Sequence, residues 1–323
     1  MKIQKVNINS LDFEQYCILA EKVGTFFNSP IWISTFSDYL DVYGIYNEDS
    51  RIIGGFQLYN QKFLYILNYI RNPYFQPHIA LFFEQKAINQ SKILSETRKL
   101  LNCFADFLDN KCGIKSITLP VGFDDFIPFY NRRFKVVPNC TYQIKLDREV
   151  ETILSECSPE RRNDFKRAKR DGVETKLVND YSEVFSIVLE RFKSKGKEID
   201  VFLLKKILFE IANNTNSFAY VAYYHGKQAS TCLVLYDKTT AYYMFGGYSN
   251  NNGHSGAGSL VVWESILHCK KIGLEVFDFE GSVVPKVEKY FRAFGGKQLP
   301  LYTINKAPFI LECGMKLFKP SQF

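Results

Sequence analysis

The chain has 323 residues and a formal net charge of +7, with 46% hydrophobic and 16% aromatic residues. At about 150 residues per domain this length predicts two domains, and the apolar content excludes disordered and fibrous proteins. The charge suits a polyanionic partner such as a nucleotide, a tRNA or a phosphorylated substrate. The eight cysteines form no CxxC pair and there are only four histidines, so we expect reduced thiols and no metal site.

The sequence contains no stretch that predicts a signal peptide or a membrane span. The first residues lack an apolar run of the length that a signal peptide needs, and the longest apolar run, Phe63 to Leu67, is far shorter than a membrane-spanning helix. We therefore expect a cytoplasmic protein without a transmembrane segment.

The first half predicts a strand meander followed by alternating helices and strands. Aromatic and β-branched runs separated by turn residues predict three antiparallel strands, and apolar spacing then predicts a long helix. The complete series is three strands, helix, strand, short helix and strand, at residues 39–46, 51–59, 62–70, 91–108, 114–119, 124–131 and 135–146.

A helical segment connects this half to the next. A helix is predicted at 151–157, and a second one begins with Ser158 as N-cap and Pro159 at its first position, and ends before Gly172. Two further helices are predicted, at 181–195 and 200–213.

The second half repeats the order of the first. The corresponding elements are predicted at 217–224, 228–236, 240–245, 256–272, 275–279, 286–293 and 299–305. At one constant offset, the tyrosines at 43, 46 and 59 align with those at 220, 223 and 236. At a second offset, residues 111, 113, 130, 132, 134, 142 and 144 align with identical residues at 271, 273, 290, 292, 294, 302 and 304. Chance identity is the alternative, but the matching element order favours a duplication, with domains at 1–150 and 151–323.

The connecting helix carries a concentrated positive charge. Residues 158–170 hold six basic residues against two acidic ones. At 100° per residue, Arg162, Lys166, Lys169 and Arg170 share one face, while Phe165 and Ala168 lie on another and can anchor the helix. This face is a candidate contact for a phosphate or a nucleic-acid backbone, and an ordinary solvated surface is the alternative.

A glycine-rich loop, residues 249–260, leaves a strand and opens a helix. Glycines at a helix N-terminus let backbone N–H groups approach an anion. The loop is neither a P-loop nor a Rossmann turn, and a purely structural turn is the alternative. Its candidate ligand-binding residues are His254, Ser255, Gly256, Gly258 and Ser259.

Four residues of segment 277–296 carry groups suited to acid and base chemistry. Asp278 and Glu280 alternate at a strand end, so both are expected to face one side at the rim of the sheet. A carboxylate can accept a proton from an attacking amine, and the hydroxyl of Tyr290 can return one to a leaving group. Arg292 follows Tyr290 on the same short helix. Alternatively, the carboxylates cap this helix or pair with Arg292.

The two copies differ at these positions. The first copy has Thr118 and Pro120 where the second has Asp278 and Glu280, so only the second copy is expected to be catalytic.

The meander, the loop GHSGAGSLVVWESI, the strand FDFEG and the tyrosine-containing helix before FGGKQLPLYTINK resemble the GNAT acyltransferase fold. Two such copies joined by SPERRNDFKRAKRDGVE resemble the Fem family of peptidoglycan bridge-forming aminoacyltransferases and its GNAT-type acetyltransferase relatives. The resemblance implies an α/β (α+β) chain of two tandem GNAT-like domains, each a mixed, mostly antiparallel sheet flanked by helices. In the GNAT loop pattern Gly256 and Gly258 fill the glycine positions, but Gly253 stands where Gln or Arg is usual.

The resemblance also implies an activity. This is the transfer of an acyl group to an amine, with the donor lying against the sheet of the second copy. We expect direct displacement without a covalent enzyme intermediate, in the cleft between the copies, with the first domain binding the acceptor. Acyl-CoA or an aminoacyl-tRNA is the expected co-substrate, with no permanently bound cofactor. The acceptor is expected to be a small amine, phosphorylated or belonging to a cell-envelope or polysaccharide precursor, and no DNA partner is expected. Transfer from aminoacyl-tRNA and a non-catalytic binding protein are the alternatives.

Overall fold

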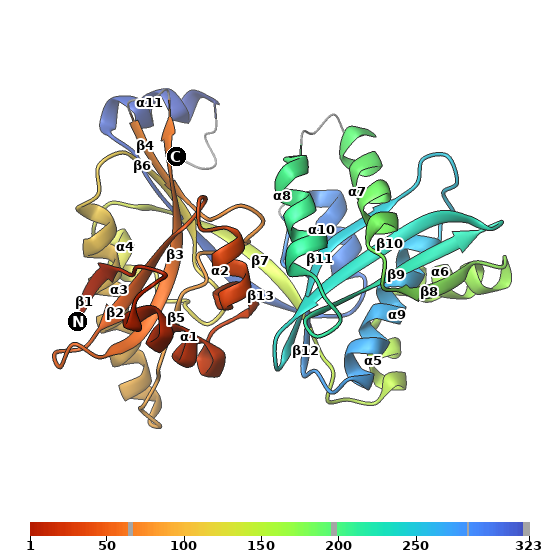
Figure 1. The fold of residues 1–323 in the computed structure, drawn as a ribbon, viewed down its shortest axis with the longest axis horizontal. Helices are drawn as coiled ribbons and strands as arrows, with labels where there is room; N and C mark the ends of the chain where they lie inside the picture. The colour runs from red at the N-terminus through yellow and green to blue at the C-terminus, as the bar shows by residue number, and fades with distance from the viewer. Residues whose placement is uncertain (64–66, 195–198, 283, 319–323) are drawn as a thin grey trace. The chain divides into compact units, whose positions relative to one another are not determined.

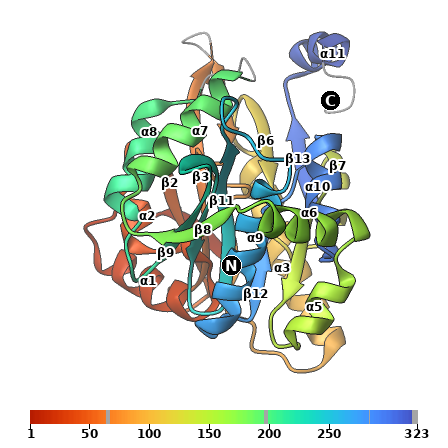
Figure 2. The ribbon, with the colours of Figure 1, turned by 90° about the vertical axis from the view of Figure 1, so that its right-hand side faces the viewer.

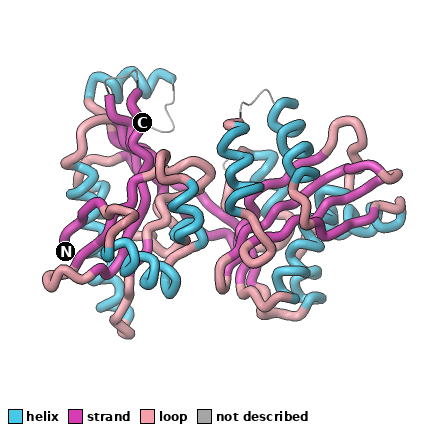
Figure 3. The backbone as a smooth tube through the Cα atoms, in the orientation of Figure 1, coloured by secondary structure: helices cyan, strands magenta, loops and turns pink. Residues whose placement is uncertain are grey.

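The computed structural model describes residues 1–63, 67–194, 199–282 and 284–318. The chain divides into two compact units, residues 1–140 with 300–323 and residues 141–299 (Figure 1). In each unit a sheet is flanked by helices, as Figure 3 shows by colour. The predicted α/β class with two sheet-and-helix domains is therefore confirmed.

The first unit begins with elements that the sequence did not predict. These are β1 (Lys2–Lys5), α1 (Leu11–Val23), a 3₁₀ turn η1 (Phe26–Asn28) and α2 (Pro30–Thr35). Helix α1 buries Tyr16, Leu19 and Ala20 but leaves Leu11 74% exposed and Ile18 59% exposed. Its apolar residues therefore do not form a single stripe along one face, and the spacing of apolar residues in the sequence does not indicate this helix.

The remaining predicted strands and helices of the first unit are present, and β5 and α11 are additional to them. These elements are β2 (Asp41–Tyr46), β3 (Ile52–Phe63), β4 (Leu67–Arg71), β5 (Phe82–Phe83), α3 (Gln90–Asp109), β6 (Ile114–Thr118), α4 (Ile127–Tyr130) and the C-terminal α11 (Phe309–Phe318). The predicted strand 62–70 falls partly on residues 64–66, outside the described ranges. Helix α3 covers the sheet and buries Phe104 against Phe56, with ring centroids 4.7 Å apart.

The second unit contains the predicted helices and the second sheet. Its elements are α5 (Val150–Glu156), α6 (Pro159–Arg170), β8 (Glu174–Val178), α7 (Ser182–Ser194), α8 (Val201–Lys206), a π turn η2 (Ile207–Ile211), β9 (Ser217–Tyr224), β10 (Lys227–Tyr236), β11 (Thr240–Tyr248), α9 (Ala257–Lys271), β12 (Val276–Asp278) and α10 (Pro285–Arg292). Figure 2 shows α7 and α8 on one face of this sheet and α9 on the other.

Both sheets have the same strand order, and each takes its last strand from the other copy. The orders are β1-β2-β3-β4-β6-β13 and β8-β9-β10-β11-β12-β7, where β7 is Lys135–Lys145 and β13 is Lys297–Lys306. Strand β13, the end of the second copy, pairs with β6 (Thr303 opposite Thr118), and β7, the end of the first copy, pairs with β12 (Ile144 opposite Phe277). This exchange puts residues 300–323 in the first unit. The compact units therefore differ from the continuous domains 1–150 and 151–323 that the repeat predicted.

Two searches of the described residues found nothing. No helix there is long and apolar enough to cross a membrane. No group of three or more His, Cys, Asp or Glu side chains within the same ranges is placed to hold a metal ion.

Candidate functional site

The two parallel strands at the centre of the second unit separate after a short pairing. Strands β11 and β12 pair in parallel over only three positions, ending with Tyr242 opposite Asp278, although β11 continues to Tyr248. In the pairing with β10, Phe245 lies opposite Leu233 and Tyr243 lies opposite the next residue, Val234. Met244, between Tyr243 and Phe245, has no opposite residue and forms a β-bulge. Ligands bind beyond the carboxyl ends of parallel strands, and bulges are enriched beside active sites. This split is the candidate site.

Helix α9 begins beside the split with unsatisfied backbone donors. Its N-cap, Gly256, provides no side-chain cap. The first-turn amides, including those of Gly258 and Ser259, have no acceptor within the helix. Such a turn attracts an anion through its N–H groups and the helix dipole. The structure thus places two of the predicted loop residues where an anionic group can be bound.

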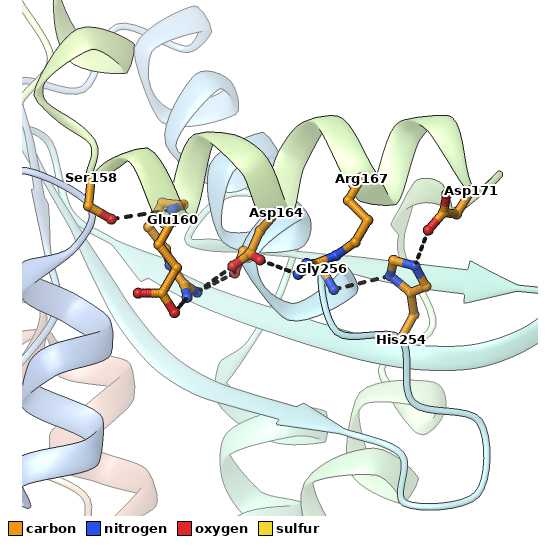
Figure 4. A network of polar contacts seen from close by, with 9 residues as sticks. Ser158, Glu160, Asp164, Arg167, Asp171, His254 and Gly256 are labelled. Carbon is orange, nitrogen blue, oxygen red and sulfur yellow. Dashed lines mark hydrogen bonds and ion pairs between the residues drawn. The ribbon is translucent and has the colours of Figure 1, made fainter.

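His254 fixes the loop rather than facing a ligand. Its Nδ1 accepts a hydrogen bond from the Gly256 amide at 3.1 Å, and its Nε2 lies 3.2 Å from Oδ2 of Asp171 at the end of α6 (Figure 4). The Gly256 amide is therefore already bonded. Ser255 is exposed beside it.

Gly256 also has a packing role that the sequence did not reveal. A Cβ at this position would lie 2.4 Å from the carbonyl oxygen of Asp164 and 3.1 Å from Cβ of Ala168, so α6 packs directly on the loop. At Gly258, by contrast, a Cβ would meet Ser230 Oγ at 3.5 Å and Tyr290 Oη at 3.7 Å, which are ordinary contacts.

Alanine at these two glycines should therefore have different effects on stability. We expect Gly256→Ala to lower the free energy of unfolding by about 1–3 kcal/mol, because backbone must move to admit the methyl group. Gly258→Ala should change it by less than about 0.5 kcal/mol. Urea denaturation of both variants measures this difference, and equal losses would show that α6 does not pack on the loop as described.

A buried ion-pair cluster joins α6 to α9. Arg161 and Asp164 are only 8% and 4% exposed. Nη1 of Arg161 donates to Asp164 Oδ2 at 2.9 Å and to Ser259 Oγ at 2.5 Å, and Ser259 Oγ donates to Asp164 Oδ2 at 2.9 Å. Glu160 and Arg167 complete the cluster from the same helix (Figure 4). The cluster fixes the first turn of α9 relative to α6.

Tyr290 lies against this cluster, as required for a role at the site. Its ring is 5.0 Å from the Arg161 guanidinium carbon, and its hydroxyl lies beside Gly258. Burial raises the pKa of Tyr290, with Arg161 and Ser259 opposing the shift. The phenol is therefore protonated at neutral pH. The aligned residue of the first copy, Tyr130, is 66% exposed, so only the second copy buries this hydroxyl.

Asp278 is buried and fully engaged. Its Oδ1 accepts from Thr141 Oγ1 at 2.5 Å and from the Glu280 amide at 2.8 Å, while Oδ2 accepts from Gln143 Nε2 at 2.6 Å. Burial raises the pKa of Asp278, and these three hydrogen bonds oppose the shift. With both oxygens bonded, Asp278 positions the turn that carries Glu280.

Glu280 is strained and has a free oxygen. Its φ of 60° is in the left-handed region, which non-glycine residues rarely adopt. Within the described residues, its Oε2 is buried without a hydrogen-bond partner. Burial raises the pKa of Glu280 well above its ordinary value, and the charges of Asp278 and Asp237 add to the shift. Backbone strain and an unsatisfied carboxyl both cost stability and are typical of a functional group.

Arg292 lies apart from these carboxylates. Its Nε donates to Glu288 Oε1 at 2.8 Å, one turn earlier on α10, and its side chain is 59% exposed. Glu288 in turn accepts from the Tyr142 hydroxyl. The alternative that Arg292 pairs with Asp278 or Glu280 is not what the structure shows.

The predicted basic face of α6 is exposed but partly neutralised. Phe165 and Ala168 are buried, as expected. Lys169 lies 3.3 Å from Glu264, Arg170 2.8 Å from Asp171, and Arg162 contacts the Ser155 carbonyl. Lys166 is exposed, and forms no ion pair with any residue the structure describes.

The sequence missed Arg161 and Asp164 although it contained a signal for them. Residues 161, 164, 165 and 168 share the i, i+3, i+4, i+7 spacing of one helix face. Two of these residues, Phe165 and Ala168, are apolar and buried, so charged residues on the same face had to be buried as a pair. The roles of Thr141 and Gln143 had no sequence signal, because they come from the exchanged strand β7.

Comparisons with known proteins agree with this geometry. Residues 161–292 match the family described as an acetyltransferase (GNAT) domain. No curated protein matches the chain. Among solved structures, FemX has a TM-score of 0.66 at 10% identity, covering 98% of this chain and 99% of that one. The C-terminal domain of a putative lysylphosphatidylglycerol synthetase from Agrobacterium fabrum has a TM-score of 0.60 at 10% identity, with 96% coverage of both chains.

A third similar structure is a tandem GNAT protein from the clavulanic acid biosynthesis pathway, with a TM-score of 0.56 at 12% identity, covering 95% of this chain and 99% of that one. At these identities the likeness concerns the fold alone. It confirms the tandem GNAT architecture that the sequence predicted.

Proposed function

We propose that the second unit transfers an acyl group from acyl-CoA to an amine, since residues 161–292 match the family described as an acetyltransferase (GNAT) domain. The observation that carries this proposal is Glu280, a buried carboxyl with a free oxygen where β11 and β12 separate. Such a group is suited to accept a proton from a nucleophile.

The reaction would proceed by direct displacement. The amine nitrogen attacks the thioester carbonyl, a C–N bond forms, and Glu280 accepts the proton that the nitrogen loses. The C–S bond then breaks, and the Tyr290 hydroxyl donates a proton to the departing thiolate. Backbone N–H groups of the separated strands stabilise the oxyanion of the tetrahedral intermediate.

Base and acid lie beside different elements. Tyr290 lies on the face covered by α9, beside Gly258 and Ser259. Glu280 instead follows Asp278, which pairs with Tyr242, and its charge acts on Tyr242. The base must reach the attacking nitrogen and the acid the departing sulfur, which are different atoms, so separate groups for the two roles fit acyl transfer.

The donor pyrophosphate would lie at the start of α9. Gly258 and Ser259 offer amides without intrahelical acceptors, and the missing Cβ of Gly258 leaves room beside Tyr290. Lys166 and Arg162 on α6 supply exposed positive charge for the remaining phosphate. The amine acceptor, a small molecule that can itself be phosphorylated or part of a cell-envelope or polysaccharide precursor, would be bound by the first unit.

Binding of CoA tests the donor site without a known acceptor. We expect CoA at 100 times its Kd to stabilise the chain by about 2.7 kcal/mol. Gly258→Val, whose branched side chain fills the space beside Tyr290, should abolish this stabilisation. Gly314→Ala is the matched control, because a Cβ there meets nothing within 4 Å. Thermal unfolding of the natural chain, Gly258→Val and Gly314→Ala with increasing CoA tests this expectation. Equal stabilisation of all three proteins would refute the site.

The exposed basic face of α6 favours aminoacyl-tRNA as a second candidate donor. Its binding would depend steeply on ionic strength, since each phosphate contact contributes to the slope of log K against log salt. Filter binding of aminoacyl-tRNA between low and moderate salt distinguishes the donors. Tight, salt-sensitive tRNA binding without stabilisation by CoA would favour the tRNA-dependent reaction.

A further inference from the structure

The first unit contains an arginine packed on a pair of tyrosine rings. Arg71 is the last residue of β4, where it pairs with Tyr59 on β3 and Ser116 on β6. Its guanidinium carbon lies 5.2 Å from the Tyr59 ring centroid and 4.4 Å from that of Tyr74. A third ring, Tyr39, lies 6.4 Å and 6.1 Å from these two. The rings of Tyr59 and Tyr74 are themselves 5.1 Å apart, so the guanidinium lies over a pair of contacting rings.

Arg71 has no anionic partner among the residues that the structure describes. It forms no ion pair there, and its Nε is buried without a hydrogen-bond partner. The side chain is half-buried, so its charge has lost part of its hydration. Rings stacked on a guanidinium leave its edge N–H groups free, and these groups match the oxygens of a carboxylate or phosphate.

The surroundings of Arg71 correspond to the split of the second unit. Strands β4 and β6 are parallel, as β11 and β12 are, and Arg71 is at the carboxyl end of β4. The loop that follows is strained, with φ of 58° at Phe75 and 49° at Ala80. Strain of this kind in bulky residues is concentrated at binding sites.

The strained loop is also held rigidly on the sheet. Asn72 donates through Nδ2 to the Pro77 carbonyl and accepts through Oδ1 from the Thr118 amide, both at 2.9 Å. The amides of Gln57 and Gln76 lie 2.8 Å apart, both buried. Tyr74 is therefore presented to Arg71 by a fixed backbone, which makes the site preformed.

We propose that Arg71, with Tyr59 and Tyr74, binds the carboxylate or phosphate group of a small-molecule ligand in the first unit. The anion contacts the guanidinium edge, and an unsaturated or ring part of the ligand lies along the tyrosines. The inference rests on the first unit alone, so it holds or fails independently of the transfer reaction.

Calorimetric titration of the full chain with phenyl phosphate, benzoate and neutral benzamide tests the proposal. At least one of the two anions should bind with a Kd below about 10 mM and perturb the near-ultraviolet tyrosine spectrum, while benzamide should not. The anion that binds more tightly identifies the phosphate or carboxylate source. An anion that binds elsewhere in the chain still binds to the Arg71 variant, and the heat of that binding is subtracted from the heat measured for the natural chain.

The variants decide whether Arg71 is responsible. Arg71→Met, which keeps the packing of the stem, should weaken the anion about tenfold or more. Arg51→Gln is the matched control, because Arg51 is an exposed arginine of the same unit that pairs with Glu84. If Arg71→Met does not fold, Tyr74→Leu replaces it. Failure of both anions to bind the natural chain, or binding unchanged by these variants, would overturn the proposal.

Discussion

Replacing Glu280 with glutamine should lower the rate of acyl transfer by about 10²–10⁴-fold, the contribution of a positioned general base. Glutamine keeps the shape and backbone of Glu280 but cannot accept a proton. CoA thiol release from acetyl-CoA, with a panel of amines, measures the rate. Glu275→Gln is the matched control, since Glu275 is exposed and lies just before β12. A rate unchanged in Glu280→Gln would remove Glu280 from the mechanism.

Relative to the natural chain, the same variant should become more stable as the pH rises, because the natural chain loses stability. Burial raises the pKa of Glu280 well above its ordinary value of 4.5, so the folded chain holds this proton more tightly than the unfolded chain does. That contribution is fully present below pH 4.5 and is lost as the pH rises through the raised pKa. Glutamine has no proton to lose.

Activity and stability of the natural chain should therefore change in opposite directions with pH. The transfer rate should increase as Glu280 ionises, with a pKa above that of an ordinary glutamate, while the free energy of unfolding falls. In Glu280→Gln this component of the stability profile should be missing. The free energy of unfolding and the transfer rate, each measured against pH for the natural chain and for Glu280→Gln, test these two expectations. Identical pH dependence of stability in the two proteins would contradict the burial of Glu280.

Removing the charge of Arg161 should have the largest effect on stability. Arg161→Ala leaves the buried carboxylate of Asp164 with the more exposed Arg167 as its ion-pair partner and removes the contact of α6 with Ser259, and we expect a loss of about 3–5 kcal/mol. Arg162→Ala, on the exposed face one residue later, should change the free energy of unfolding by less than about 0.5 kcal/mol. Urea denaturation of the two variants measures the contrast.

A double replacement separates the charge from the packing. Arg161→Met combined with Asp164→Leu removes both charges and keeps apolar volume, so it should recover much of the stability that Arg161→Ala loses. It should still weaken CoA binding, because the first turn of α9 and the ring of Tyr290 lose their common contact. If the double variant is as unstable as Arg161→Ala, the polar contacts of the cluster themselves stabilise the chain, and an unpaired buried charge does not explain the loss.

The sequence predicted most elements of the fold because most are strongly patterned. The N-cap Ser158, with Pro159 after it, began α6 as expected, and the Ser158 hydroxyl accepts from the Arg161 amide. The repeat predicted the shared strand order. It did not predict that β7 and β13 exchange, because a local pattern specifies a strand but not which of two similar neighbours it pairs with.

The candidate site was predicted in part for a similar reason. Asp278, Glu280 and Tyr290 lie at ends of elements that the pattern specified, so their place at the split followed from topology. The different roles of Asp278 and Glu280 depend on Thr141 and Gln143, which arrive on an exchanged strand. Gly256 was expected to approach a ligand, yet its missing Cβ accommodates α6. Such contacts between distant segments leave no trace in local spacing.

Hydrogen–deuterium exchange of the full chain, with and without saturating acetyl-CoA, tests most directly whether the second unit holds the donor. The proposed mechanism predicts slower exchange in residues 249–262 and 284–294, which contain the start of α9 and helix α10, and no change in the aligned segments of the first unit. Protection confined to the first unit, or no protection anywhere, would contradict the assignment of the second copy as the donor-binding and catalytic one.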